Sequence, residues 1–130
     1  MRQVARATVV ITNPDEFAVA LEYVPTRMAA PVVLAKGRGT FAQEIKREAR
    51  WYEIPIVENK PLAQALYRSV EVGGTIPAKL YRAVAEVLAF IYRAQTRMRE
   101  EAAAKASGAT GGAGPTGGGT GSVDSAGSTR

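Results

Sequence analysis

Short runs of β-branched and other apolar residues, separated by turn residues, dominate the first sixty positions of the chain. Residues 7–12 (ATVVIT) and 17–23 (FAVALEY) lie on either side of an Asn-Pro turn, and residues 31–35 (PVVLA) and 54–57 (IPIV) follow. Runs of this kind, bounded by Pro, Gly and Asn, are typical of β-strands. The pattern therefore predicts four short strands.

Apolar residues at helical spacing predict helices between and after these strands. Residues 40–51 begin with Thr40 and carry Gln43 three positions later, which is the arrangement of a capping box with Thr40 as the N-cap. A short helix is expected to start with Pro61 as its first residue. Pro77 opens a longer amphipathic helix. Its apolar residues recur at i, i+3, i+4, i+7, i+8 and i+11: Leu80, Ala83, Val84, Val87, Leu88 and Ile91.

The order of these elements predicts the fold class and the division of the chain. Strand, helix and strand in succession over residues 31–57 indicate a right-handed parallel crossover. We expect an α/β fold: a small mixed central sheet of about four strands surrounded by about four helices, with a protruding C-terminal helix and a disordered tail. The folded domain covers residues 1–94, a charged helical extension residues 95–105, and a Gly/Ser-rich flexible tail residues 106–130.

Composition narrows the chemistry that is open to the chain. Its 130 residues suffice for one domain with a modest core. The sequence has no histidine and no cysteine, which removes the commonest general base and the imidazole and thiolate metal ligands. No run approaches the roughly 20 apolar residues of a membrane-spanning helix. Any reaction must therefore use carboxylates, lysines, hydroxyls or the backbone.

The chain is basic, with a formal charge of +5, and basic domains bind nucleic acid, anionic lipid or acidic proteins. The lysines and arginines are scattered and fall mostly at predicted solvent positions, so no nucleic-acid partner is expected. A small basic nucleic-acid-binding domain remains an alternative, and salt-dependent binding to RNA or DNA would favour it.

Two further motifs have both a functional and a structural interpretation. Residues 36–39 (KGRG) lie between a strand and a helix, where phosphate-binding loops occur, but they lack the glycine spacing of such loops. We interpret them as a tight strand-to-helix turn. The adjacent carboxylates Asp15 and Glu16 lack a supporting acidic cluster, so no metal and no cofactor is expected.

The Asn13-Pro14 pair carries chemistry that follows from covalent structure. An asparagine side-chain nitrogen can attack its own main-chain carbonyl, forming a succinimide and expelling the nitrogen of the next residue. The competing deamidation requires a backbone N–H on that residue, and proline has none. Most Asn-Pro pairs are inert turns, and cleavage requires a turn that holds the amide nitrogen over the carbonyl carbon. Asn13 and Pro14 are therefore a candidate single-turnover self-cleavage pair, not the site of a turnover enzyme.

Several segments, in order, resemble the cytoplasmic domain of the FlhB family of flagella and its YscU, SpaS and EscU relatives in injectisomes. The similarity covers residues 8–93. The segments that carry it are VVITNP, FAVALEY, APVVLAKG and IPIVENKPLAQALYRSVEVGGTIPAKLYRAVAEVLAFIYR. The length of the last segment favours the flagellar branch. The resemblance implies a small sheet surrounded by helices, which the family joins to a membrane domain of four helices.

The resemblance also implies a function. Members of the family cleave themselves within an Asn-Pro-Thr-His motif, and cleavage helps the export gate to change from early rod and hook substrates to late filament substrates. By this match Asn13 is the cyclising residue and Pro14 the leaving group. We expect a substrate-specificity switch module at the inner face of the bacterial inner membrane. Its expected partners are other export-apparatus proteins, secreted substrates, and the membrane domain of a full-length protein or of the export gate.

The chain departs from the family at the motif itself, because Asp15 replaces Thr and Glu16 replaces His. A cleavage half-life of about an hour corresponds to a barrier of roughly 22 kcal/mol, and loss of an assisting His costs about 10²–10⁴ in rate. Two carboxylates beside the carbonyl further disfavour the oxyanion. We expect slow or absent cleavage and a module that docks through the loop of residues 13–16, either as an excised domain or as a stand-alone docking protein.

Overall fold

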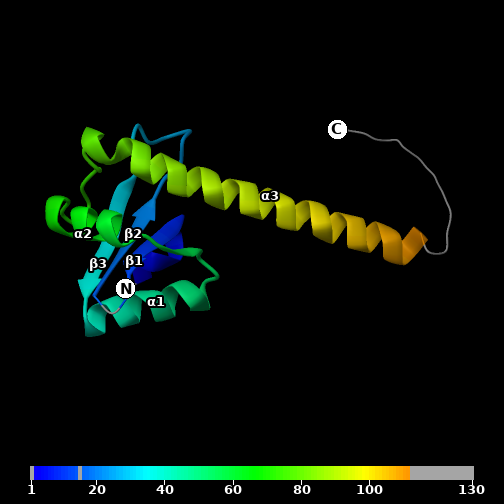
Figure 1. Cartoon of the computed structure of the whole chain (residues 1–130), viewed down its shortest axis with the longest axis horizontal. Coiled ribbons are helices and arrows are strands. Elements are labelled where there is room, and N and C mark those ends of the chain that lie inside the picture. Colours follow the sequence, from blue (N-terminus) through cyan, green and yellow to red (C-terminus); the bar gives the residue numbers. More distant parts are fainter. Residues whose placement is uncertain (1, 15, 112–130) are drawn as a thin grey trace. The chain divides into compact units, whose positions relative to one another are not determined.

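A four-stranded mixed sheet forms the centre of the first of two units into which the chain divides (Figure 1). The computed structural model describes residues 2–14 and 16–111. The first unit spans Met1–Ile91 and the second Tyr92–Arg130. The elements are, in chain order, η1 (Arg2–Arg6), β1 (Val9–Asn13), β2 (Phe17–Glu22), β3 (Val32–Arg38), α1 (Thr40–Trp51), β4 (Ile56–Glu58), α2 (Lys60–Ser69), η2 (Ala78–Leu80) and α3 (Tyr81–Gly111).

The strands lie in the order β3-β2-β1-β4. β2 is antiparallel to both β1 and β3, whereas β4 is parallel to β1. The predicted four-stranded mixed sheet is therefore confirmed. β3 and β4, which α1 connects, run in the same direction, as a parallel crossover requires, although β2 and β1 lie between them.

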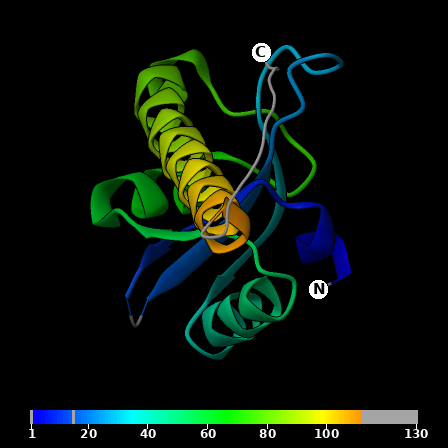
Figure 2. The same ribbon diagram turned by 90° about the vertical axis from the view of Figure 1, so that its right-hand side faces the viewer.

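Alternate residues of the central strands point to opposite faces of the sheet, and helices cover both faces. Val9 and Ile11 of β1 belong to a core with α2 and the first part of α3, whereas Val10 belongs to a second core with α1 and η1. Figure 2 shows α1 on one side of the sheet and α2 with the start of α3 on the other. Because both faces of the sheet are buried, the central strand β2 is apolar at every position except Glu22.

The predicted capping box at the start of α1 is wrong. Gly39, with φ 60° and ψ −123°, is the N-cap, Thr40 is the first helical residue, and no side chain caps this end of the helix. The Gln43 N–H donates to the Gly39 carbonyl at 3.1 Å. Glycine tolerates a positive φ, so the chain turns into the helix one residue earlier than a threonine N-cap would require.

β3 is longer than the sequence predicted, and the predicted four-residue turn over residues 36–39 is wrong. The strand continues to Arg38, because Gly37 and Arg38 pair with Ala18 and Phe17 of β2. Only Gly39 forms the turn into α1. A Cβ atom on Gly37 would lie 2.8 Å from atoms of Phe41, the second residue of α1. Glycine at this position therefore allows α1 to pack closely against β3.

The other helices begin close to the predicted positions. Asn59 caps α2, because its side-chain oxygen accepts a hydrogen bond from the Leu62 N–H at 3.3 Å, and Pro61 lies in the first turn. After Pro77, one 3-10 turn leads into α3. None of the helices formed by the described residues carries an apolar stretch long enough to cross a lipid bilayer.

α3 continues without interruption to Gly111. The predicted charged extension, residues 95–105, is therefore helical, and so are residues 106–111, which the sequence assigned to the flexible tail. The remainder of that predicted tail, residues 112–130, lies outside the described residues.

Candidate functional site

The Asn13-Pro14 pair lies at the hairpin that joins β1 to β2, the two central strands of the sheet. Asn13 is the last residue of β1, pairs with Phe17, and is 4% exposed. Its side-chain nitrogen Nδ2 is buried, and none of the residues that the structure describes forms a hydrogen bond with it. Pro14 and Glu16 are exposed, and Asp15 lies outside the described residues. The structure thus holds the predicted nucleophile in a fixed strand without engaging its amide nitrogen.

The carbonyl of Asn13, the electrophile in the predicted cleavage, already accepts a hydrogen bond. The donor is the Glu16 N–H at 3.0 Å, which closes the hairpin as a β-turn. A donor at this position would also stabilise negative charge on the oxygen when the carbonyl is attacked. The Glu16 carbonyl in turn accepts a hydrogen bond from the Gly39 N–H at 2.9 Å, so the turn is anchored to the start of α1.

The chain before the Asn13-Pro14 bond is held on both sides. Thr12 pairs with Ala18 of β2 and with Glu58 of β4, and its carbonyl accepts a hydrogen bond from the Asn59 N–H at 2.9 Å. A break in the backbone after Asn13 would therefore leave β1 paired within the sheet.

Phe17, which follows the hairpin, contacts Tyr67 of α2, and Lys36 binds the same helix. The ring of Phe17 lies 4.6 Å from the ring of Tyr67 in α2, measured between centroids. Lys36 Nζ donates to the carbonyls of Tyr67 and Val70 at 2.8 and 2.9 Å, and lies 5.0 Å from the Tyr67 ring centroid. Lys36 thus binds the C-terminal end of α2, which gives this residue of the KGRG segment a structural role.

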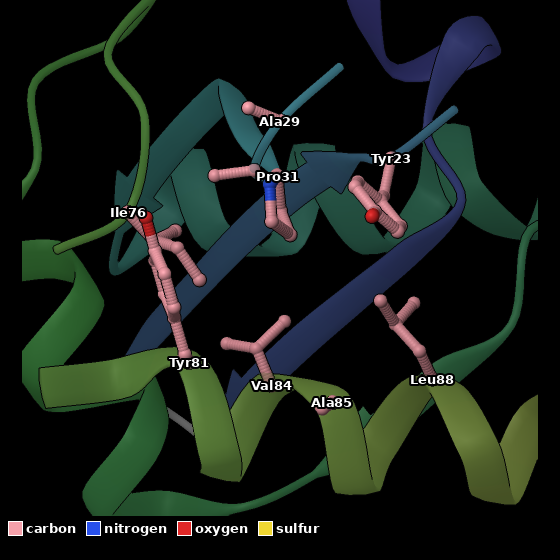
Figure 3. A pocket seen from close by; sticks show the side chains of 9 residues that line it. Tyr23, Ala29, Pro31, Ile76, Tyr81, Val84, Ala85 and Leu88 are labelled. Carbon is pink, nitrogen blue, oxygen red and sulfur yellow. The ribbon is translucent and has the colours of Figure 1, made fainter. Parts of the chain in front are cut away.

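An apolar pocket, which the sequence did not predict, lies between α3 and the segment that leads into β3 (Figure 3). Val84 and Leu88 point from α3 towards Pro31 and Tyr23. The cavity has a volume of about 180 Å³, and a cavity of roughly 150 Å³ can bind benzene. A phenyl-sized apolar side chain therefore fits. The lining residues are Tyr23, Ala29, Ala30, Pro31, Ile76, Tyr81, Val84, Ala85 and Leu88.

The pocket was missed because four separate segments form it. Val84 and Leu88 have the spacing of a core-facing helix stripe, and they do belong to the core. The available signal was the set of small residues, Ala29, Ala30 and Ala85, whose side chains leave space unfilled where the segments meet. Periodicity does not detect this set, because Ala85 lies far from Ala29 and Ala30 in the sequence.

Among residues 2–14 and 16–111, no three acidic side chains converge in a way that could hold a metal ion.

Comparison with known proteins places these features in a family. The model of the FlhB HrpN YscU SpaS family matches residues 1–91. The flagellar biosynthetic protein FlhB of Aquifex aeolicus is 54% identical over 91 residues, which are 70% of this chain and 26% of that protein. FlhB of Yersinia enterocolitica is 51% identical over 100 residues, 77% of this chain and 26% of that protein. The chain thus spans about a quarter of the length of these relatives.

The fold is also shared with a solved structure. The crystal structure of the cytoplasmic domain of FlhB from Shewanella putrefaciens superposes with a TM-score of 0.73 at 37% identity, covering 76% of each chain. The expected resemblance and the expected fold are confirmed by these matches. The chain belongs to the FlhB HrpN YscU SpaS family.

Proposed function

We propose that this chain is the cytoplasmic substrate-specificity switch module of a bacterial flagellar protein export apparatus, acting at the inner face of the inner membrane. The family match and the two flagellar relatives support this function. The observation that carries it is the hairpin. Asn13, directly before Pro14, is buried, its Nδ2 has no hydrogen-bond partner among the described residues, and its carbonyl accepts a hydrogen bond.

The module works by docking and not by catalytic turnover. Its partners are other proteins of the export apparatus, the secreted substrates, and the membrane domain of a full-length protein or of the export gate. The apolar pocket is the docking place for a secreted substrate and takes one phenyl-sized apolar side chain from an extended segment. The volume of the cavity and its lining by apolar side chains support this assignment.

Self-cleavage at Asn13-Pro14 is slow or absent in this chain. The hairpin supplies the buried amide and the hydrogen bond to the carbonyl, but Asp15 and Glu16 place two carboxylates beside the reacting peptide. Their negative charge opposes the oxyanion that forms on attack. The switch therefore stays in its uncleaved form, in which the early substrates are exported and the late ones are not.

A domain exchange tests this function. In this experiment, residues 7–105 of this chain replace the cytoplasmic domain of FlhB from Yersinia enterocolitica. We expect cells that carry the chimera to secrete rod and hook proteins but no filament protein. The further change Ala85→Phe, which fills the pocket with a ring, should abolish secretion of both classes. Glu86→Phe is the matched control, since Glu86 is exposed and does not line the pocket.

The outcomes separate the two parts of the proposal. If the chimera accumulates at the membrane and the cells secrete no flagellar protein, the export function is contradicted. Secretion that is unaffected by Ala85→Phe would refute only the role of the pocket.

A further inference from the structure

Glu22, the last residue of β2, is a buried carboxylate shared by two arginines from different segments. Its side chain is 6% exposed. Arg6 Nη2, at the end of η1, lies 3.2 Å from Oε1, and Arg27 Nη2 lies 3.4 Å from Oε2. A buried carboxylate is costly unless it is paired. Each oxygen of Glu22 therefore pairs with one arginine, and both arginine side chains are more than half exposed.

Arg27 lies in a turn that leads directly into residues 29–31, which form one wall of the apolar pocket. The N–H groups of Arg27 and Met28 both donate to the Val24 carbonyl, at 3.0 and 2.9 Å, and the Val24 N–H donates to Met28 Sδ at 3.3 Å. These three bonds close the turn around Arg27. Ala29 and Ala30, which follow immediately, line the pocket.

The far end of the same wall is held by backbone pairing. The Pro31 carbonyl accepts a hydrogen bond from the Ile76 N–H at 3.0 Å, and Val32 forms an antiparallel bridge with Thr75. The pocket wall is thus fixed by backbone bonds at Pro31 and by the side-chain pair of Glu22 and Arg27 at its beginning. Of these two attachments, the Glu22–Arg27 pair is the one that depends on charged side chains.

We propose that Glu22 is a positioning residue for the pocket: through Oε2 and Arg27 it sets the pocket wall, while through Oε1 and Arg6 it independently anchors η1. The inference rests on the proposed function, because the pocket is taken as the place where a substrate side chain docks. Each arginine variant should then loosen its own segment and leave the other unchanged.

Two measurements on the full chain test this. Hydrogen exchange followed by mass spectrometry reports on residues 24–30 and 4–8. Ligand-observed ¹⁹F NMR with N-acetyl-4-fluorophenylalanine amide reports the affinity of the pocket. We expect Arg27→Ala to speed exchange in residues 24–30 and to weaken probe binding about twofold to fivefold, the loss of one ion pair to a largely exposed arginine. Exchange in residues 4–8 should not change.

Arg6→Ala should give the reverse pattern, with faster exchange in residues 4–8 and an affinity within about twofold of the parent. Glu22→Gln should loosen both segments. Arg27→Lys should restore most of the affinity, because an ammonium can still pair with the carboxylate. Arg50→Ala, at an exposed arginine of α1, is the matched control and should change neither readout.

Two results would overturn the inference. One is unchanged exchange in residues 24–30 of Arg27→Ala, which would mean that the wall does not need Glu22. The other is equal loosening of both segments by Arg6→Ala and Arg27→Ala, which is the effect of a general loss of stability. Failure of the parent chain to bind the probe would contradict the docking role of the pocket, and the exchange data would still decide whether Glu22 positions the wall.

Discussion

Gly37 and Gly39 bring α1 against the sheet for two different physical reasons. Gly37 is buried in β3, and a side chain there would collide with Phe41. Gly39 is exposed with open space around it, but its φ of 60° with ψ of −123° is a conformation that L-residues avoid. A composition-based interpretation treats both simply as turn glycines, and only the structure separates a packing requirement from a conformational one.

Alanine at either position should lower the free energy of unfolding. We expect a cost of about 1–3 kcal/mol for Gly37→Ala from overpacking and a similar cost for Gly39→Ala from backbone strain. Urea unfolding of the two variants measures this. A semisynthetic chain with D-alanine at position 39 should keep the parent stability, because a D-residue favours a positive φ. Equal destabilisation by L- and D-alanine at this position would contradict the assigned cause.

At the scale of elements, helix bodies and strand cores follow from apolar periodicity, whereas their ends do not. The amphipathic stripe of α3 and the apolar runs of β1 and β2 were predictable, because burial on the sheet dictates them. The start of α1 depends on the backbone angles of Gly39, and the length of β3 depends on pairing with β2. Neither the start of α1 nor the length of β3 can be detected in the local pattern of hydrophobic residues. In β3, pairing with β2 overrides the local turn signal of residues 36–39.

The C-terminal end of α1 shows the same kind of local determinant. The Ile54 N–H donates to the Ala49 carbonyl at 2.7 Å and the Glu53 N–H to the Arg50 carbonyl at 3.2 Å. These two bonds form a Schellman motif. Its left-handed position, usually glycine, is occupied by Glu53 with φ 58°.

Replacing this glutamate by glycine should therefore stabilise the protein. A left-handed conformation costs an L-residue about 1–2 kcal/mol, and the additional backbone entropy of glycine costs about 0.5–1 kcal/mol. We expect Glu53→Gly to raise the free energy of unfolding by about 0.5–1 kcal/mol, seen as a higher urea midpoint. Glu53→Ala, which keeps a Cβ, is the control and should show no gain. A lower midpoint for the glycine variant would mean that the Glu53 side chain makes a stabilising contribution.

At the scale of the molecule, the fold class was predictable, and so was the location of the Asn13-Pro14 pair in a turn between two strands. Asn13 and Pro14 were identified from covalent chemistry, and the structure places them together at one hairpin, with Glu16 in the same turn. The apolar pocket and the shared carboxylate of Glu22 were not predictable, because both arise from segments that meet only in the folded chain. A glutamate at a strand end looks like a solvent-facing residue until its partners are known.

We propose that the hairpin of this chain can support cleavage after Asn13 but lacks the side chains that make cleavage fast. The buried amide of Asn13 and its hydrogen-bonded carbonyl support this proposal, and by the family resemblance Asp15 and Glu16 stand where the cleavage motif has Thr and His. If the geometry is intact, restoring those two side chains should restore the reaction, and removing Asn13 should abolish it again.

Intact-mass spectrometry under denaturing conditions, on fresh protein and on protein aged for days, tests this claim most directly. Denaturation is needed because β1 would stay paired in the sheet after a cut. The unmodified chain should give only the full-length mass, Asp15→Thr/Glu16→His should give a fragment that begins at Pro14, and adding Asn13→Ala should remove that fragment. Complete cleavage of the unmodified chain on purification, or an intact restored variant, would contradict the claim.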